Sequence, residues 1–225
     1  WDFLPVNPNE IKQIEAVRGP GSAVWGANAM TGVVNLITKR PKEIVGTSLL
    51  FGGGELGTLY GSVTHAGVAE SGNFSYKLTG GYYEMDAYEG PPSLAGADEN
   101  SGTKQPKAEL RMDWDLSEES YLSVGGGWAG TDGIIHTGIG PFEIQDGTDL
   151  SYAQVDWNKA AWHVGAFWNG LSADSENLLS RGLDGEFLPF AFVTDTYNFE
   201  ASNTSVLGMH NIFTYGANYR TSDFE

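Results

Sequence analysis

The chain of 225 residues has no cysteine, and this absence removes several classes of site at once. Disulfide frameworks, zinc ribbons and thiol catalysis all need cysteine. The four histidines never occur as H-x-x-x-H, and no G-x-S-x-G elbow is present. The sequence therefore indicates no metal site, no cofactor and no enzymatic activity.

Basic residues and long apolar runs are also scarce. Twelve Lys and Arg stand against 29 Asp and Glu, for a formal net charge of -17. Such a surface repels phosphate backbones, so no nucleic-acid partner is expected. No apolar run reaches the ~18 residues of a membrane-spanning helix. The chain starts at Trp1 without a signal-peptide pattern, and we expect it to begin inside a longer protein.

Glycine and aromatic residues are abundant, with 31 Gly, 7 Trp and 10 Tyr, which favours β structure. From about residue 44 onward, period-two segments alternate with polar connections. In residues 108–116 (AELRMDWDL) the apolar side chains fall on one face and the charged ones on the other. Similar alternation at residues 74–82, 152–157, 162–168 and 213–219 predicts further amphipathic strands.

The connections between these segments are alternately short and long. Short links are predicted near 70–73, 117–120, 158–161 and 202–208, and long ones near 87–104, 131–149 and 174–191. The link near 53–57 is a short exception. Alternate links of an up-and-down sheet lie at the same end, so one end carries short turns and the other long loops. Outer-membrane β-barrels have this asymmetry.

Aromatic residues fall near the ends of the predicted strands. Trp114, Trp157 and Trp162 would lie at one height on the apolar face, and Tyr82, Trp128 and Tyr219 toward the opposite end. Two such belts flank the apolar band of a membrane barrel, whereas a soluble sandwich would use these rings to fill its core.

The opposite faces of the strands are polar, which implies a wide lumen because small barrels are packed with apolar side chains. We therefore predict an all-β fold: about nine strands of a larger antiparallel transmembrane barrel. Since a bilayer tolerates no open sheet edge, the missing strands would lie outside this sequence.

The glycine-rich segment before the first strand resembles a phosphate-binding loop only superficially. A dinucleotide motif would need glycine at position 24, where the chain has Val24, and a P-loop would need lysine after Gly26, where it has Ala27. No strand–loop–helix unit follows. The glycines permit sharp turns and close backbone packing instead.

This segment, NEIKQIEAVRGPGSAVWGANAMTGVVNLITKRP, resembles the end of the plug domain of TonB-dependent outer-membrane receptors. The family pattern reads approximately I-E-x-I-E-V-x-R-G-P-x-S-x-x-Y/W-G-x-x-A-x-x-G-V-I-N-I-I-T-K. The matching residues are Ile11, Ile14, Glu15, Val17, Arg18, Gly19, Pro20, Ser22, Trp25, Gly26, Ala29, Gly32, Val33, Asn35, Ile37, Thr38 and Lys39.

The resemblance implies a division into the end of a plug, residues 1–42, and the first strands of a barrel of about 22 strands, residues 43–225. It implies a receptor in the outer membrane of a Gram-negative bacterium that takes up a large, scarce nutrient, most simply a ferric siderophore or cobalamin. Its partners would be TonB, through an N-terminal box upstream of Trp1, the lipid bilayer, lipopolysaccharide and the siderophore- or cobalamin-like ligand.

Three sets of site residues follow. The plug motif is carried by Glu15, Arg18, Gly19, Pro20, Gly26 and Gly32. The lumen-facing set is Glu109, Arg111 and Asp113, to which Glu15 and Arg18 would be paired or beside which they would simply be solvated. The candidate substrate contacts at the rim are Trp25, Tyr83, Tyr88, Trp128, His136 and Phe142.

Two other classes of protein are alternatives to this interpretation. A soluble carbohydrate-binding or glycoside-hydrolysing β-sandwich would use Glu109 and Asp113 as acid and base. Four residues along a strand separate them by about 13 Å, too far for either glycosidase geometry. An unplugged porin-type channel is disfavoured by the plug-like segment.

Overall fold

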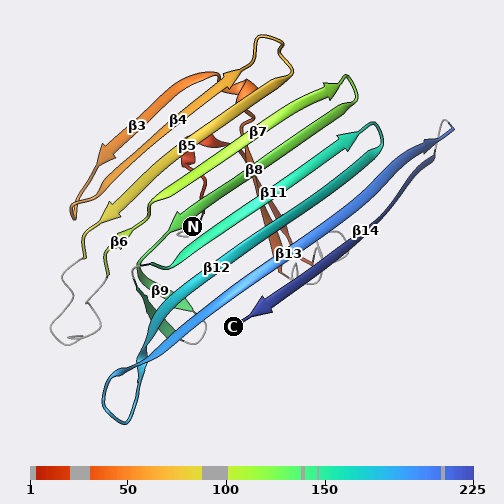
Figure 1. The fold of residues 1–225 in the computed structure, drawn as a ribbon. Helices are drawn as coiled ribbons and strands as arrows, with labels where there is room; N and C mark the ends of the chain where they lie inside the picture. Colours follow the sequence, from red (N-terminus) through yellow and green to blue (C-terminus); the bar gives the residue numbers. More distant parts are fainter. Residues whose placement is uncertain (1–3, 21–30, 88–100, 138–139, 146, 209–210) are drawn as a thin grey trace.

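The computed structural model describes residues 4–20, 31–87, 101–137, 140–145, 147–208 and 211–225, and in these residues the chain is built of strands and short turns (Figure 1). The N-terminal elements are η1 (Pro8–Glu10), β1 (Ile11–Arg18), β2 (Gly32–Thr38) and η2 (Pro41–Glu43). The elements that follow are β3 (Gly46–Gly53), β4 (Leu59–Val68), β5 (Phe74–Met85), β6 (Thr103–Lys104), β7 (Lys107–Ser117), β8 (Ser120–Gly130), β9 (Gly133–Thr137), β10 (Gly140–Ile144), β11 (Asp149–Lys159), β12 (Trp162–Arg181), β13 (Phe187–Leu207) and β14 (Asn211–Phe224).

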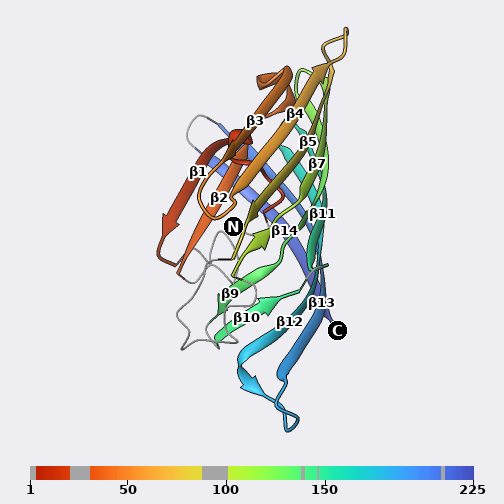
Figure 2. The ribbon, with the colours of Figure 1, turned by 90° about the vertical axis from the view of Figure 1, so that its left-hand side faces the viewer.

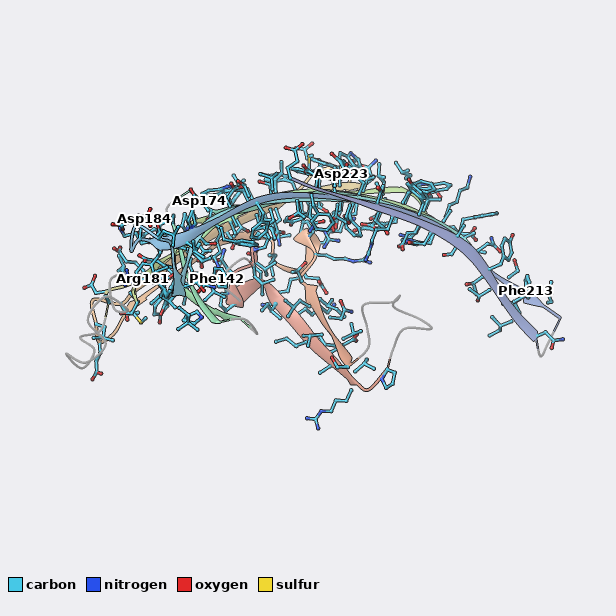
Figure 3. All side chains as sticks on the ribbon, turned by 90° about the horizontal axis from the view of Figure 1, so that it is seen from below. Phe142, Asp174, Arg181, Asp184, Phe213 and Asp223 are labelled. Atoms are coloured by element: carbon cyan, nitrogen blue, oxygen red, sulfur yellow. The ribbon has the colours of Figure 1, made fainter. Side chains whose placement is uncertain are left out.

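One large antiparallel sheet of the described chain has twelve strands, and nine of them follow one another in the order β14-β13-β12-β11-β8-β7-β5-β4-β3. The short strands β6, β9 and β10 pair beside this path, β6 with β5 and β10 with both β12 and β9. The sheet is open, with β3 and β14 at its edges, and it is curved (Figure 3). Strands β1 and β2 form a separate two-stranded sheet, the plug hairpin, which lies on the concave side of the large sheet (Figures 2 and 3). The prediction of part of an antiparallel barrel preceded by a plug segment is confirmed.

The two faces of the large sheet have the opposite polarity to a soluble sheet. Lys77 is 0% exposed, whereas its neighbour Leu78 on the other face is 56% exposed. On β7 the same holds for Glu109, at 5%, and Leu110, at 41%. Charged residues are thus covered on the concave face while apolar ones are uncovered on the convex face. A barrel surrounded by lipid has this distribution.

Directly paired residues form rows across the convex face. One row runs through Leu78, Leu110, Gly126, Ala153, Trp168 and Tyr197. The next row runs through Tyr76, Met112, Val124, Val155, Ala166, Phe199 and Tyr219. Neither row contains a charged side chain, so the apolar band extends without interruption from β5 to β13.

Aromatic side chains border this band. At the end with short turns, Trp114 and Trp157 share a row through Leu122, and Trp162 lies in the next row. At the other end, the indole Nε1 of Trp168 donates a hydrogen bond to Asp195 Oδ1 at 2.7 Å. This pairing of aromatic and acidic groups is typical of a membrane–water boundary.

Two rings at the far end behave as the sequence predicts, and one does not. The hydroxyl of Tyr82 donates to Glu84 Oε2 at 3.0 Å, and Trp128 lies two rows beyond the row of Met112. Tyr219, by contrast, pairs with Phe199 in the row next to that of Trp114. It therefore belongs to the band and not to its far border.

Most connections have the predicted lengths, but the prediction of a third long loop is wrong. Residues 174–191 were expected to form a loop, whereas β12 continues to Arg181 and β13 starts at Phe187. The acidic residues that suggested a loop, Asp174 and Glu176, alternate along a strand that has left the apolar band. The short link near 202–208 is likewise shifted, because β13 continues to Leu207.

Strands β12 and β13 extend past the end of β11. Beyond that end, β10 of the β9–β10 hairpin pairs with β12. Phe142 of β10 pairs with Asn177 of β12, beyond the point where β11 begins opposite Ser172. We call this part, residues 133–137, 140–145 and 173–192, the rim extension; it lies at the lower left of Figure 1. Among the described residues, no helix is long and apolar enough to cross a membrane.

Candidate functional site

The plug hairpin meets the concave face of the large sheet, which we call the inner wall, through a buried group of charges. Strands β4, β5 and β7 present Thr64, Thr79 and Glu109 in one row. Lys77 lies two residues below Thr79 on the same face, because side chains alternate along a strand. The η1 turn that leads into the plug hairpin lies against these residues through Glu10.

Lys77 joins the plug to the wall. Its Nζ lies 2.7 Å from Glu10 Oε1 of the plug and 2.8 Å from Glu109 Oε1 of β7. The Thr79 hydroxyl also donates to Glu10 Oε1, at 2.7 Å. We call Glu10, Lys77, Thr79 and Glu109 the lysine cluster; its two carboxylates are 1% and 5% exposed.

The local sequence explains how Glu10 is held. Asn7 caps the η1 turn, and its backbone N–H donates to Glu10 Oε2 at 3.3 Å. Pro8 supplies the restricted φ that suits the first position of such a turn. Gly81 of β5 faces Asn7, and a Cβ at that position would lie 2.2 Å from Asn7 Oδ1. The turn therefore fits the wall closely only because residue 81 is glycine.

The lysine cluster contains two carboxylates and one ammonium group. Buried charges are tolerated when they are paired and hydrogen-bonded, and removing one partner leaves an uncompensated charge. Lys77 and Glu109 belong to the wall and balance each other without the plug. Glu10 is the additional charge that the plug brings, so the wall keeps a balanced pair if the plug is displaced.

A second network lies next to the cluster on the inner wall. Arg111 donates from Nε to Asp113 Oδ1 at 2.9 Å and from Nη2 to the hydroxyl of Tyr121 at 2.9 Å. The Ser123 hydroxyl donates to the same Asp113 oxygen at 2.8 Å. Glu109, Arg111 and Asp113, the set expected to face the lumen, therefore all lie on the side that faces the plug.

A third contact lies at the end with short turns. Lys12 of β1 forms an ion pair with Glu43 of η2, and Lys42 forms one with Asp115 of β7. The Lys42 ammonium group also donates to the carbonyl oxygen of Gly72 at 2.6 Å. The Lys12 ammonium and the backbone N–H of Arg40 both bond to the Glu43 carboxylate and lower its pKa.

The charged plug-motif residues do not pair with the lumen-facing set in the structure. Glu15 accepts hydrogen bonds from Gln13 and Asn35 within the plug hairpin, and Arg18 is exposed. No ion pair joins either residue to the inner wall in the described part of the chain. Glu10 joins the plug to the wall instead, and Lys12 joins β1 to Glu43 of η2. Both residues precede Glu15 and Arg18 in the sequence.

The motif glycines do meet backbone requirements. Gly19 has a φ of +97°, a conformation that glycine adopts without strain. Gly32 pairs with Arg18, and a Cβ there would lie 2.7 Å from the carbonyl oxygen of Val17. Pro20 lies two residues after the end of β1 at Arg18, and Gly26 lies outside the described residues.

The rim candidates that the structure describes lie at different places on the sheet. Trp25 and Tyr88 lie outside the described residues, as does the side chain of His136 in β9. Trp128 points to the convex face and is 41% exposed. Tyr83 lines a cavity of about 590 Å³ beside the plug, and Phe142 is covered at the rim extension.

A smaller cavity of about 200 Å³ lies between the plug hairpin and the inner wall. Leu36 and Thr38 line it from β2, and Glu109, Tyr152 and Gln154 line it from the wall. A buried Glu109 Oε2 has no hydrogen-bond partner. The contact is therefore partly polar and loosely filled. Among the described residues, no three His, Asp or Glu side chains are grouped so as to hold a metal ion.

Sequence comparison finds relatives over short stretches. No protein-family model matches the chain. Over 38 residues, 17% of this chain, it is 53% identical to the ferric enterobactin receptor PirA of Pseudomonas aeruginosa, of which the match covers 5%. Over 89 residues, 40% of this chain, it is 28% identical to the vitamin B12 transporter BtuB of Vibrio vulnificus, of which the match covers 14%.

Structural comparison extends the likeness to the whole chain. The FrpB iron transporter of Neisseria meningitidis matches all of it with a TM-score of 0.73 and 16% identity. The copper transporter OprC matches 99% of it with a TM-score of 0.71 and 14% identity. The siderophore receptor PirA of Acinetobacter baumannii matches 97% with a TM-score of 0.71 and 16% identity. The chain spans 36% to 38% of these structures.

The fold, with its apolar convex face and its plug hairpin on the concave side, is that of a plugged outer-membrane barrel. The motif of residues 9–41 resembles the plug end of TonB-dependent outer-membrane receptors, and the solved structures that share the fold include siderophore, iron and copper transporters.

Proposed function

We propose that this chain is part of a receptor that imports a large, scarce nutrient, a ferric siderophore or cobalamin, across the outer membrane with energy delivered by TonB. Residues 1–42 then belong to the plug and residues 43–225 to the barrel, which further strands complete. The observation that supports this best is the lysine cluster, where a plug carboxylate meets a charge pair that the wall already balances.

Such a contact suits a plug that must hold firmly and yet be released. Glu10 brings one carboxylate into a polar site, and its departure leaves Lys77 paired with Glu109. The contact at Lys12 and Glu43 is exposed, and exposed ion pairs contribute little to stability. The plug is therefore held by a few polar contacts beside a cavity, and not by a continuous apolar core.

The relatives support the choice of substrate class by their names, which include receptors for siderophores and a transporter for vitamin B12. In this proposal Trp25, Tyr83, Tyr88, Trp128, His136 and Phe142 remain candidates for substrate contact. Trp128 is the weakest of them, because it points to the convex face. Lipopolysaccharide would surround the acidic outer side of the rim extension.

The soluble β-sandwich receives no support. A sandwich covers the apolar face of one sheet with a second sheet. In the described residues, the only second sheet is the plug hairpin, and it lies on the polar face. An unplugged channel is disfavoured by the same hairpin.

The test is uptake by cells that carry the full-length gene. Radiolabelled ferric siderophores and cobalamin would be supplied to a deletion strain and to the complemented strain, each with and without TonB. We expect uptake of at least one ligand only when both the receptor and TonB are present. Outer-membrane fractionation and a gel mobility that changes on boiling would verify the folded barrel. TonB-independent uptake, or a soluble protein, would contradict the proposal.

A further inference from the structure

The convex face of the large sheet is hollowed at two adjoining places over the neighbouring strands β8 and β11 (Figure 1). Successive rows of directly paired residues on this face are Gly130 with Asp149, Trp128 with Ser151, Gly126 with Ala153, and Val124 with Val155. A pocket of about 290 Å³ lies at the first two rows, and a groove of about 420 Å³ lies at the last two. No row separates the pocket from the groove, so we treat them together as the convex site.

The outer part of the convex site is a polar pocket with aromatic walls. The rings of Tyr82 and Trp128 line it and are 37% and 41% exposed. A Cβ at Gly130 would lie 3.3 Å from Trp128 Cζ2, so the indole ring lies over this glycine. The charged residues that line the pocket are Lys104, Asp132 and Asp149.

The inner part of the convex site is an apolar groove. Ala153 and Ala166 line its low part, and larger rings stand beside them on β12, β13 and β14, namely Trp168, Tyr197, Phe199 and Tyr219. The Trp168 ring is fixed, because its Nε1 donates to Asp195 and a Cβ at Gly170 would lie 2.7 Å from its Cζ2. Among the described residues, no charged side chain lines the groove.

The length of the convex site fits one leaflet of a bilayer. Asp149 in the pocket and Val155 in the groove are six residues apart on β11. At about 3.3 Å per residue, this separation is about 20 Å. Half of a bilayer, with its head-group region, is also about 20 Å thick. An amphiphile can therefore lie along β11 with its head in the pocket and a chain in the groove.

The charges of the pocket favour a head group that contains an ammonium group. Two carboxylates, Asp132 and Asp149, line the pocket with a single cation, Lys104, and Glu84 pairs with Lys104 across β5 and β6. Aromatic faces attract ammonium groups as well. The excess of carboxylates repels a head group that carries only phosphates, such as that of lipopolysaccharide. A zwitterionic head matches both signs.

We propose that the convex site binds one zwitterionic phospholipid. Its ammonium group lies between the two aromatic rings and the carboxylates of Asp132 and Asp149, its phosphate lies at Lys104, and an acyl chain fills the groove beside Trp168. The inference goes beyond nutrient uptake and rests only on the position of the convex face in a bilayer.

The test uses purified full-length receptor, freed of lipid in detergent, and lipids with the same oleoyl chains: phosphatidylethanolamine, which is zwitterionic, phosphatidylglycerol, which is anionic, and diacylglycerol. Lipopolysaccharide is added as a further probe. Native mass spectrometry would count the retained molecules and give their affinities. We expect a single retained phosphatidylethanolamine that binds at least about tenfold more tightly than each other lipid.

Two variants separate the head group from the chain. Asp132→Asn/Asp149→Asn removes the attraction for the ammonium group and should bring phosphatidylethanolamine and phosphatidylglycerol within about threefold of each other. Ala153→Leu fills the groove and should weaken both lipids at least about fivefold, with their ratio kept. Heat-modifiable gel mobility would verify that each variant is folded.

Matched controls lie on the convex face of β14, outside the convex site. Asp223→Asn/Glu225→Gln removes two carboxylates at the same end of the sheet, and Ala217→Leu enlarges an alanine that faces Ala201. Both should leave the affinities unchanged. A control that acts as strongly as its matched variant would show a general effect of surface charge or bulk, which would overturn the convex site.

The remaining outcomes also separate this proposal from the receptor itself. Equal binding of phosphatidylethanolamine and phosphatidylglycerol, or tighter binding of lipopolysaccharide, would overturn the assignment of the head group. A preference for phosphatidylethanolamine that survives both variants would place the lipid elsewhere and overturn the convex site too. TonB-dependent uptake would persist in each of these cases, whereas a protein without heat-modifiable mobility and without uptake would contradict the receptor.

Discussion

The membrane-spanning part of the sheet and its rim extension use the same strand alternation with opposite polarity. In the spanning part, Leu78 is exposed and Lys77 is covered, because lipid replaces water on the convex face. In the rim extension, Asp174 lies on the convex face and Phe190 on the concave face. One pair of strands, β12 and β13, contains both arrangements. The change of environment is therefore located within single strands, at Trp168 and Asp195.

Burial alone therefore does not identify a hydrophobic core in this protein. The covered residues of the spanning part are polar and are covered by the plug, as Lys77, Thr79 and Glu109 are. In the proposed function they form the contact that releases the plug. The covered residues of the rim, Phe142 and Ile144, form an apolar base like that of a soluble sheet.

The largest effect is expected from Lys77→Met. This substitution leaves Glu10 and Glu109 buried without their cation, which destabilises a protein by about 3–5 kcal/mol. Urea unfolding of the full-length receptor in detergent would measure the loss, and protease sensitivity of the plug should rise with it. The triple variant Lys77→Met/Glu10→Gln/Glu109→Gln should recover most of the stability, since it removes the uncompensated charges. A single variant as stable as the wild type would mean that the cluster does not hold the plug.

The next largest effect sharpens the contrast between the two regions. Leu78→Arg places a charge on the lipid-facing side of the band and should cost about 2–4 kcal/mol. Ala191→Arg places the same charge on the convex face of the rim extension, opposite Asp174, and should stay within about 0.5 kcal/mol of the wild type. Unfolding from lipid vesicles would compare them. Equal losses at both positions would show that the apolar band does not end at Trp168.

Period-two alternation predicted most strands of the large sheet, because the two environments of a barrel strand impose it on nearly every residue. The same pattern predicts that Glu109, Arg111 and Asp113 share one face, and in the structure they lie on the concave side of β7. It failed at residues 174–191, because there the apolar side chains lie on the concave face and the acidic ones on the convex face. Acidic residues in this segment were therefore interpreted as part of a loop. The pattern that could have predicted these strands is the continued period of two, seen in Asp174 and Glu176 and again in Leu188, Phe190 and Phe192.

The plug contact was harder to predict. Glu10 and Lys77 are 67 residues apart, and no local period links a turn to a strand that it meets only in the folded chain. The pattern N-x-x-E at Asn7 to Glu10 is typical of a capped turn, but it does not identify the residue that the turn contacts. A pairing of Glu15 and Arg18 with the wall was considered because these residues belong to the family motif. The wall contact is instead made by Glu10, which precedes the motif charges.

A smaller effect is expected at the boundary between the two regions. Trp168→Phe keeps the ring but removes the indole N–H that donates to Asp195. The loss should be about 1–2 kcal/mol, because a hydrogen bond to a charged group is strong but Asp195 at the boundary regains water. Asp195→Asn keeps an acceptor for the indole and should cost less. If Trp168→Phe is neutral, the contact is solvated and does not mark the boundary.

The smallest effect concerns the exposed contact of the plug, and it is a dependence on pH. Because the pKa of Glu43 is lowered in the folded protein, the Lys12–Glu43 contact contributes stability above the ordinary glutamate pKa of about 4.3. That contribution is lost as the pH falls through the lowered value. Hydrogen exchange of the β1 amides in the full-length receptor should therefore become faster, relative to the intrinsic rate, below this range.

The Lys12→Met variant distinguishes this contact from general acid destabilisation. Without the Lys12 ammonium group, the pKa of Glu43 should return toward its ordinary value, and the pH dependence of β1 exchange should shrink. High salt should have a similar effect on the wild type, since an exposed pair is screened. Exchange governed by the buried lysine cluster should respond much less to salt. If both contacts respond equally, the distinction between a firm and a weak attachment of the plug does not hold.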